Sequence, residues 1–241
     1  MKLLNIEDYL SDRKFDEGLK INFSFDGERK PRIQKITEIC AGKDIIHVGC
    51  VDHIPLIEEK IKNNTWLHKL LTESASNCIG VDINKEGIEY IQKIGYNNVY
   101  TEDLMSPSLE QIKNNKWDYM VLGEILEHVD NPCSFLKSLK ELYKNNIVYI
   151  IISVPNAFCY YNFRNMHSNF EMINSDHRST FTAYTLNKIL HLAGFKLNEL
   201  FYVDPIYKFH HKVINKLLNK KIISIHPGLS NTLLAIASFN K

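Results

Sequence analysis

Residues 117–132 have the sequence WDYMVLGEILEHVDNP, in which a short apolar run, WDYMVL, ends at Gly123. A continuous apolar run of this length is typical of a strand with both faces covered, as in a parallel sheet. The polar residues after the glycine would then lie beyond the carboxyl end of the strand, where sheets of this kind bind ligands. The stretch therefore predicts a buried strand that leads directly into a functional loop.

Similar apolar runs occur on both sides of this stretch. The predicted strands are DIIHV (44–48), CIGV (78–81), IVYIIISV (147–154) and the shorter NVY (98–100). Helical patterns separate them, at Pro31–Cys40, Ile54–Leu71, Lys85–Ile94 and Phe135–Tyr143. Strands that alternate with helices predict a parallel sheet with right-handed crossovers.

The last third of the chain has a different pattern. A helix is predicted over Thr182–Ala193, a strand over Phe195–Val203, a helix over Ile206–Leu218 and a final strand over Thr232–Phe239. We therefore expect one α/β domain over residues 31–241. Its sheet should be doubly wound, mostly parallel and seven-stranded, with an antiparallel C-terminal edge strand.

Length and composition fit a soluble, cytoplasmic protein. The chain has 241 residues, of which 44% are hydrophobic and 24% charged, and its formal net charge is +1. With charges this evenly balanced, the protein has no overall positive potential that would attract nucleic acid or an anionic membrane. Five scattered cysteines without a C-x-x-C pair indicate neither disulfides nor zinc. The N-terminus lacks a signal-peptide core, and no apolar run could span a bilayer, so we expect a monomer or homodimer without membrane partners.

Three other strand ends carry residues suited to a nucleoside. Gly49 would let the chain turn sharply and approach a ligand, although many glycines after strands only make turns. Asp82 could accept two hydrogen bonds from a ribose diol; alternatively, it caps the next helix. Asp103 and Leu104 could hold an adenine amino group and cover its ring, or belong to a polar loop.

Residues 117–132, with a strand, G-E-x-x-E-H and a D-x-P-like turn, resemble the segment after the fourth strand of Rossmann-like S-adenosylmethionine-dependent methyltransferases. Four more segments occur in the family's order: GVDIN (80–84), EDL (102–104), ISVPN (152–156) and HLAGF (191–195). The resemblance covers residues 31–240 and implies a Rossmann-like fold, S-adenosylmethionine as cofactor and S-adenosylhomocysteine as product.

The resemblance also implies which residues contact the cofactor. Gly49 and Cys50 would approach its methionine part, and Asp82 would hold the ribose. The remaining contacts would come from Val51 and His53 in the glycine loop, Ile83, Asp103 and Leu104 around the adenine, and Gly123 and Glu124 near the sulfonium.

The glycine loop departs from the family pattern. The family has an acidic residue followed by G-x-G-x-G, whereas this chain has His47 at the acidic position and keeps only Gly49. Val51 and His53 occupy the other glycine positions. Their side chains should narrow the loop and rearrange its cofactor contacts.

Glu124, Glu127 and His128 are spaced i, i+3 and i+4, which predicts that they share one side of a helical turn. Carboxylates and an imidazole together could bind a divalent cation such as Mg²⁺. The pattern is similar to ubiquinone-biosynthesis O-methyltransferases, and to small-RNA 2′-O-methyltransferases, in which a later histidine joins the metal. His177 is placed for that role. Alternatively, the helix dipole favours the glutamates, and His128 or His177 acts as a metal-free general base.

The leading hypothesis is methyl transfer to oxygen, or secondarily nitrogen, of a small polar metabolite such as a sugar or surface-glycan precursor. The alternatives are an RNA 2′-O-methyltransferase, although the near-neutral charge disfavours nucleic acid, and a non-catalytic cofactor-binding scaffold. Residues 1–30 are expected to form an N-terminal arm, either as a lid or packed on the domain. Residues 158–176 should carry acceptor contacts.

Overall fold

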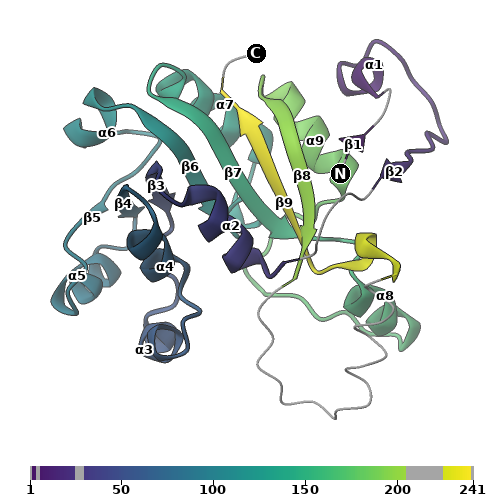
Figure 1. Ribbon diagram of the computed structural model, residues 1–241. Coiled ribbons are helices and arrows are strands. Elements are labelled where there is room, and N and C mark those ends of the chain that lie inside the picture. Colours follow the sequence, from purple (N-terminus) through teal and green to yellow (C-terminus); the bar gives the residue numbers. More distant parts are fainter. Residues whose placement is uncertain (1, 4–5, 25–29, 205–224, 240–241) are drawn as a thin grey trace.

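A seven-stranded sheet forms the centre of the computed structural model, which describes residues 2–3, 6–24, 30–204 and 225–239 (Figure 1). The strand order is β5-β4-β3-β6-β7-β9-β8. The bounds are β3 Asp44–Val48, β4 Asn77–Asp82, β5 Val99–Thr101, β6 Trp117–Gly123, β7 Ile147–Pro155, β8 Lys196–Val203 and β9 Thr232–Ser238. Strands β3 to β7 are parallel, and β9 runs antiparallel between β7 and β8. The predicted sheet with its antiparallel C-terminal edge is confirmed.

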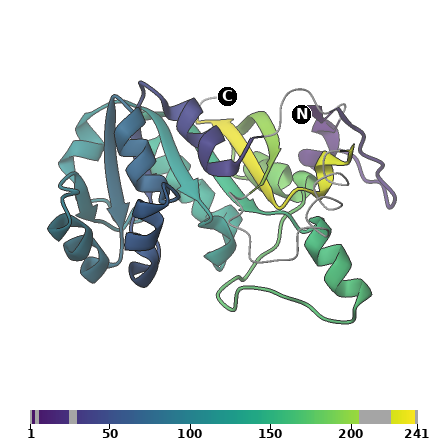
Figure 2. The same ribbon diagram turned by 60° about the horizontal axis from the view of Figure 1, so that its bottom comes forward.

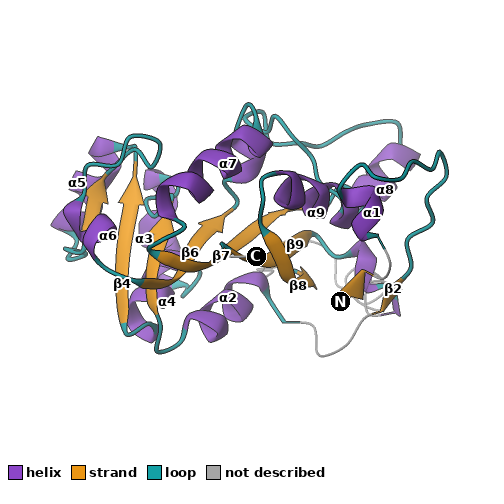
Figure 3. Cartoon of the chain, turned by 90° about the horizontal axis from the view of Figure 1, so that it is seen from above, coloured by secondary structure: helices purple, strands orange, loops and turns teal. Residues whose placement is uncertain are grey.

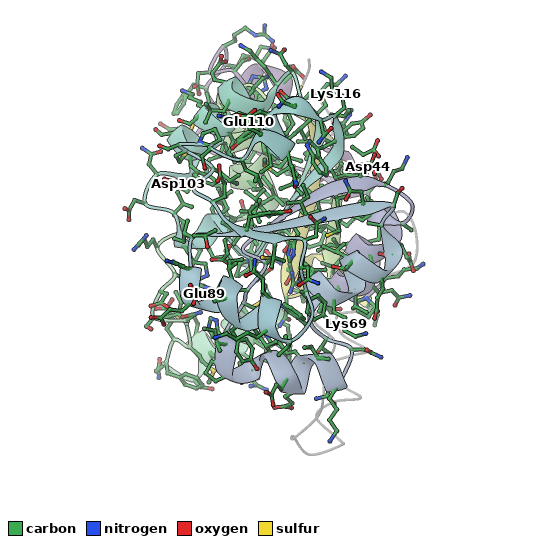
Figure 4. All side chains as sticks on the ribbon, turned by 90° about the vertical axis from the view of Figure 1, so that its left-hand side faces the viewer. Asp44, Lys69, Glu89, Asp103, Glu110 and Lys116 are labelled. Carbon is green, nitrogen blue, oxygen red and sulfur yellow. The ribbon has the colours of Figure 1, made fainter. Side chains whose placement is uncertain are left out.

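The register brings the strand ends to one level. Val48 of β3 pairs with Val81 of β4 and with Leu122 of β6. Figure 4 shows the two ends of the parallel strands: Asp44, at the start of β3, lies on one side, and Asp103, after β5, lies on the other. The loops after the parallel strands therefore meet at a single edge.

Helices cover both faces of the sheet (Figure 3). Residues Ile45 and Val121 pack with α2 and α4, whereas Ile46 and Leu122 pack with α7 and α9. This alternation leaves both faces of the central strands buried, which explains their continuous apolar sequences. The helix bounds are α2 Arg32–Cys40, α3 Ile54–Lys62, α4 Leu67–Ser74, α5 Lys85–Lys93, α6 Glu110–Asn114, α7 Pro132–Tyr143, α8 Tyr160–His167 and α9 Ala183–Leu192.

The prediction of one helix over Ile54–Leu71 is wrong, because the structure divides it into α3 and α4. Asn63 is the C-cap of α3, and Asn64 adopts a left-handed conformation with φ +51°. Asparagine tolerates this conformation better than most residues, and it ends the helix. The turn lets Trp66 donate from Nε1 to the Cys50 carbonyl oxygen, 3.1 Å away.

The predicted helix after residue 182 is confirmed. The Thr182 hydroxyl accepts a hydrogen bond from the Thr185 amide, 3.1 Å away, within a capping box. Gly194 follows with φ +86°, as expected where a helix ends. The helix predicted over 206–218 lies outside the described residues.

The described part of the N-terminal arm lies beside α9 and β8. It contains β1 (Lys2–Leu3) paired with β2 (Phe23–Ser24), and α1 (Glu7–Leu10). Lys188 of α9 donates to the Tyr9 carbonyl, and the rings of Phe23 and Tyr202 meet edge to face with centroids 6.4 Å apart. The lid role stays a prediction.

All five cysteines are free, and four of them are buried, as expected for thiols that act as small hydrophobes. None of the described helices combines the length and apolar character needed to cross a bilayer. The cytoplasmic location and the oligomeric state stay predictions.

Candidate active site

A cavity of about 670 Å³ lies beyond the carboxyl ends of β3, β4, β5 and β6. Its volume is in the range of small-molecule and cofactor sites. Its walls include most of the predicted cofactor residues, namely Gly49, Cys50, His53, Asp82, Ile83, Asp103, Leu104, Gly123 and Glu124. The carboxyl edge of the sheet thus brings together residues that are far apart in the sequence, from Gly49 to Glu124.

Val51 is the exception among the predicted cofactor residues, because its side chain does not line the cavity. It is fully buried in a cluster with Ile57 and Ile88. A Cβ atom on Gly87 of α5 would lie 2.3 Å from Val51 Cγ1, so Gly87 provides the space for it. The predicted narrowing of the loop at this position is therefore wrong, since the bulky group points into the core.

Asp82 connects the glycine loop to the next helix. Its Oδ2 accepts a hydrogen bond from the Val51 amide at 3.1 Å, and its Oδ1 accepts one from the Asn84 amide at 2.9 Å. The cap of α5 is Asn84, whose side chain accepts from the Gly87 amide. Asp82 is therefore not the helix cap, and its carboxylate lines the cavity.

Gly49 makes the turn that the sequence predicts. Its φ is +69°, and a Cβ atom there would lie 2.4 Å from Ile125 Cδ1. Only glycine meets both conditions without strain.

The loop after β5 provides one apolar and one acidic group. Leu104 is buried, whereas Asp103 is held by the Met105 amide, which donates to its Oδ1 at 2.9 Å. Glu102 is a buried loop anchor that accepts from Ser108 Oγ at 2.8 Å. Ile83, which follows β4, is 77% exposed and lines the same cavity.

Glu124, Glu127 and His128 do not share a regular helical turn, so that prediction is wrong. Glu124 has φ +59°, and a short 3₁₀ helix, Leu126–His128, follows it. The Glu124 amide donates to the Ser153 carbonyl of β7 at 3.0 Å, which anchors the bend. Glu124 faces Arg32, with 3.9 Å between Oε1 and the arginine Nε.

Glu127, His128 and His177 form a candidate metal-binding group, and Glu124 is not part of it. One potential ligand atom from each lies within 4.8 Å of the others. Glu127 is fully buried, and neither carboxylate oxygen has a hydrogen-bond partner among the described residues. The His177 ring lies beside it, with 4.0 Å between its Nε2 and Glu127 Oε1.

Backbone contacts bring the two histidines together. The Arg178 amide donates to the Glu127 carbonyl at 2.8 Å, which connects the loop of His177 to the 3₁₀ helix. The His128 and His177 rings meet edge to face, with centroids 4.8 Å apart. His128 Nδ1 is 3.2 Å from the Asp176 carbonyl, which can only accept, so Nδ1 carries the proton and Nε2 is free to accept one.

Burial sets the charge of this group. It raises the pKa of Glu127 to about 8, with a further contribution from the negative charge of Glu124. Burial also lowers the pKa of His177, and the neighbouring His128 acts in the same direction. At neutral pH and without a cation, Glu127 therefore holds a proton and His177 is neutral.

We expect Glu127→Gln to remove a pH dependence of stability from the metal-free protein. In the unfolded chain the carboxyl ionises from pH 4.5 upward, whereas the folded group keeps its proton until about pH 8. The unfolded state loses its proton first, so the free energy of unfolding falls between these values, by up to about 1.4 kcal/mol per pH unit. Urea unfolding from pH 5 to 9 in EDTA measures the slope, with Glu86→Gln as the exposed control. Parallel curves for Glu127→Gln and the unmodified chain would contradict the assignment.

Arg32, Trp66, Leu67 and Phe135 also line the cavity but were not predicted. Arg32 begins α2, and its Nη1 donates to Ser153 Oγ of β7 at 3.2 Å. An arginine after a proline has no chemical signature in sequence, and only the fold brings it to this edge.

The segment after β7 exposes several apolar side chains and ends at the cavity. Figure 2 shows α8 and the loop after it standing away from the sheet. Asn174 and His177, at the end of this segment, line the cavity. The exposed apolar side chains are Phe158, Phe163, Met166, Phe170, Met172 and Ile173.

Comparison with known proteins identifies similar sequences and folds. A family described as a methyltransferase domain matches residues 28–200. A ubiquinone biosynthesis O-methyltransferase from Actinobacillus pleuropneumoniae serotype 7 (strain AP76) is 26% identical over 110 residues, which are 43% of this chain and 42% of the relative. The chain thus aligns with less than half the length of this curated relative.

Two solved structures share the fold. An S-adenosylmethionine-dependent methyltransferase from Archaeoglobus fulgidus has a TM-score of 0.50 and 21% identity, over 86% of this chain and 91% of the other. The small RNA methyltransferase HEN1 has a TM-score of 0.56 and 15% identity, over 91% of this chain and 27% of the other. At these identities the likeness is one of fold.

Proposed function

This chain belongs to the Rossmann-like, S-adenosylmethionine-dependent methyltransferases, and from this premise we propose that it transfers the donor's methyl group to an oxygen of a small acceptor. The observation that carries the proposal is the position of His128. Its Nδ1 is anchored to the Asp176 carbonyl, and its ring lines the cavity that also holds Asp82 and Gly49. A proton acceptor therefore lies in the same hollow as the predicted donor site.

The donor would lie along the strand ends. Asp82 would accept the ribose hydroxyls, while Ile83 and Leu104 would cover the adenine and Asp103 would contact its amino group. Gly49 and Cys50 would approach the methionine part. These roles agree with the lining of the cavity, in which each of these residues takes part.

The reaction is a direct displacement. The acceptor oxygen attacks the methyl carbon, the bond between that carbon and sulfur breaks, and S-adenosylhomocysteine leaves. The hydroxyl proton passes to His128 Nε2, or to the neutral His177 next to it. The enzyme contributes alignment of the two reactants and removal of this proton.

A divalent cation fits the group of Glu127, His128 and His177. The buried carboxyl group lacks hydrogen-bond partners among the described residues, so it needs either its own proton or a bound cation. Two imidazoles with one carboxylate suit Mn²⁺ or a later transition ion at least as well as Mg²⁺. A bound cation would supply a positive charge that orients acceptor oxygens and lowers the pKa of a hydroxyl.

If the cation is used, Glu127→Ala and EDTA should each abolish turnover, and added Mn²⁺ should restore only the unmodified, EDTA-treated enzyme. Thermal shift should show Mn²⁺ stabilising the unmodified chain but not Glu127→Ala. Glu86→Ala, an exposed residue of α5, is the matched control. Full activity in excess EDTA would show that no metal is used, and His128 or His177 would then be the base.

The apolar surface of residues 158–173 bears on the acceptor. Met172 and Ile173 are exposed and directly precede the cavity residue Asn174, so they favour an acceptor with an apolar or aromatic part beside its hydroxyl. The similarity to a ubiquinone biosynthesis O-methyltransferase is compatible with O-methylation. The sugar or surface-glycan precursor expected from sequence stays a prediction and is among the acceptors to be tested.

RNA 2′-O-methylation is the second candidate. It is favoured by the grouping of Glu127, His128 and His177, and the small RNA methyltransferase shares the fold. Short RNA should then bind with an affinity that falls steeply as salt rises. If short RNA binds weakly and its affinity does not fall steeply with salt, the small-molecule acceptor remains the proposal.

The proposal is tested in two steps. Calorimetry with S-adenosylmethionine and S-adenosylhomocysteine establishes donor binding, and methyl transfer is then measured on phenols, catechols, sugars, nucleotide sugars and short RNAs. Absence of binding by both donor and product would overturn the proposal and leave the non-catalytic scaffold.

A further inference from the structure

The segment between β7 and α9 leaves the domain and returns to it at one point. The Ala157 amide donates to the Phe181 carbonyl at 2.8 Å, and Asn156 and Phe181, both buried, form a parallel bridge. Figure 2 shows α8 and the loop after it standing away from the sheet between these two ends. Residues 158–180 therefore form one excursion with a fixed base, called the β7–α9 excursion below.

The returning half of the β7–α9 excursion is bonded to the 3₁₀ helix that carries His128. The Arg178 and Ser179 amides both donate to the Glu127 carbonyl, at 2.8 and 3.2 Å. In the opposite direction, His128 Nδ1 donates to the Asp176 carbonyl at 3.2 Å. These bonds join the excursion to the proposed base, and none of them involves the side chain of residue 178.

The Arg178 side chain contacts the peptide group of His128 itself. Its Nη1 donates to the His128 carbonyl at 2.5 Å, and its Nε lies 3.2 Å from Asp130 Oδ1. The side chains of Arg178 and Asp130 are 58% and 88% exposed, so their ion pair by itself contributes little. The hydrogen bond to the carbonyl is charge-assisted, and it fixes the backbone of the residue that carries the imidazole. Arg178 is not among the described residues that line the cavity, so its contact with the site runs through His128.

The turn that carries His128 needs support from outside. The 3₁₀ helix spans only Leu126–His128, and hydrogen bonds in such a helix have poorer geometry than those in an α-helix. It follows Glu124, whose φ of +59° is unfavourable for a residue with a side chain. Before the helix, the Glu124 amide is bonded to the Ser153 carbonyl, and at its end the Arg178 side chain is bonded to the His128 carbonyl. The arginine is thus an anchor at the His128 end of the turn.

We propose that Arg178 is a positioning residue for methyl transfer, whose side chain holds the His128 backbone so that Nδ1 stays on the Asp176 carbonyl and Nε2 stays free for the acceptor's proton. This inference rests on the proposed function, since it concerns the same base. The two bonds are reciprocal, because His128 donates to the Asp176 carbonyl and accepts from the side chain two residues later. The loss of one bond should therefore loosen the other.

Replacing Arg178 by methionine tests this role and keeps the backbone bonds of the β7–α9 excursion. We expect kcat to fall by roughly 10- to 100-fold, because a displacement of about 1 Å at a reacting group can cost a factor of this size. The dissociation constant of S-adenosylhomocysteine should change by less than about threefold, since Asp82 and Gly49 are untouched. Asp130→Asn removes the exposed ion pair alone, and Lys137→Met removes an exposed positive charge from α7. Both controls should keep kcat within about threefold of the unmodified value.

The second measurement is the tautomer of His128, which requires neither acceptor nor turnover. Nitrogen NMR of the labelled, metal-free chain at mildly alkaline pH distinguishes protonated from unprotonated ring nitrogens, and the His128 signals are those missing from His128→Asn. The unmodified chain should carry the proton on Nδ1, as the Asp176 carbonyl requires. In Arg178→Met the loosened bond should let the two tautomers mix, whereas Asp130→Asn and Lys137→Met should leave the signals unchanged.

The outcomes separate this inference from the proposed function. If the unmodified chain does not bind S-adenosylhomocysteine, the proposed function fails, whatever the ring signals show. If it binds, Arg178→Met must change both kcat and the ring signals. Only the positioning role is overturned if either stays unchanged, if S-adenosylhomocysteine binding falls as much as kcat, or if Asp130→Asn reproduces the changes. Should Arg178→Met fail to fold, Arg178→Lys replaces it, and its single donor group should give the same two changes at smaller size.

Discussion

Replacing His128 by asparagine should lower kcat by about two to four orders of magnitude, the usual contribution of a general base. Asparagine can still donate a hydrogen bond to the Asp176 carbonyl, so the loop should keep its position. It cannot accept the acceptor's proton as the imidazole Nε2 does. If the cation is used, the same substitution also removes a ligand, and the loss should lie at the upper end of this range.

Two measurements test this prediction: the rate of methyl transfer, and calorimetry of S-adenosylhomocysteine binding. The dissociation constant of S-adenosylhomocysteine should change by less than about threefold, because the variant leaves the donor contacts intact. His191→Asn, in the last turn of α9 and outside the cavity lining, is the control and should retain full activity. A kcat for His128→Asn within tenfold of the unmodified value would exclude His128 as base and as metal ligand.

Replacing Asp82 by asparagine should raise the dissociation constants of S-adenosylmethionine and S-adenosylhomocysteine by about 100-fold. The carboxylate already accepts backbone hydrogen bonds at both oxygens, and its remaining lone pairs would receive the ribose hydroxyls. Hydrogen bonds to a charged acceptor contribute about 1.5–3 kcal/mol each, and an amide replaces one acceptor oxygen by a donor. The loss of the Val51 contact would also loosen the glycine loop.

A donor without ribose hydroxyls provides the check on this explanation. The 2′,3′-dideoxy analogue of S-adenosylhomocysteine should bind the unmodified chain weakly, and Asp82→Asn should weaken it much less than it weakens the parent ligand. Glu86→Gln, in the first turn of α5, should bind as the unmodified chain does. Equal losses for both ligands would mean that Asp82 only supports the loop.

The parallel strands could be predicted from sequence because both of their faces are buried. Apart from Asp118 and Ser153, IVYIIISV and WDYMVL are apolar runs, and the structure places β7 and β6 over them with small extensions at the ends. The division of Ile54–Leu71 into two helices was missed because the hydrophobic pattern continues through Asn63 and Asn64. Two residues in a tight turn change the chain direction without changing that pattern.

The donor side of the site was largely predictable for a related reason. Residues that follow parallel strands must meet at one edge, so Gly49, Asp82 and Gly123 were expected to lie together, and they line one cavity. Val51 shows the limit of this argument. Its position in the loop was known, but the direction of its side chain depends on the space above Gly87 in another element.

Sequence by itself thus determined the order of the strands, the edge at which polar residues gather, and the family. These depend on local patterns of buried and exposed residues, which each segment carries alone. The tertiary structure alone decided that Arg32 faces Glu124, that His47 stacks on His68, and that Glu127 is fully buried. Such contacts join residues distant in the chain, and their charge and protonation depend on burial, which no single segment contains.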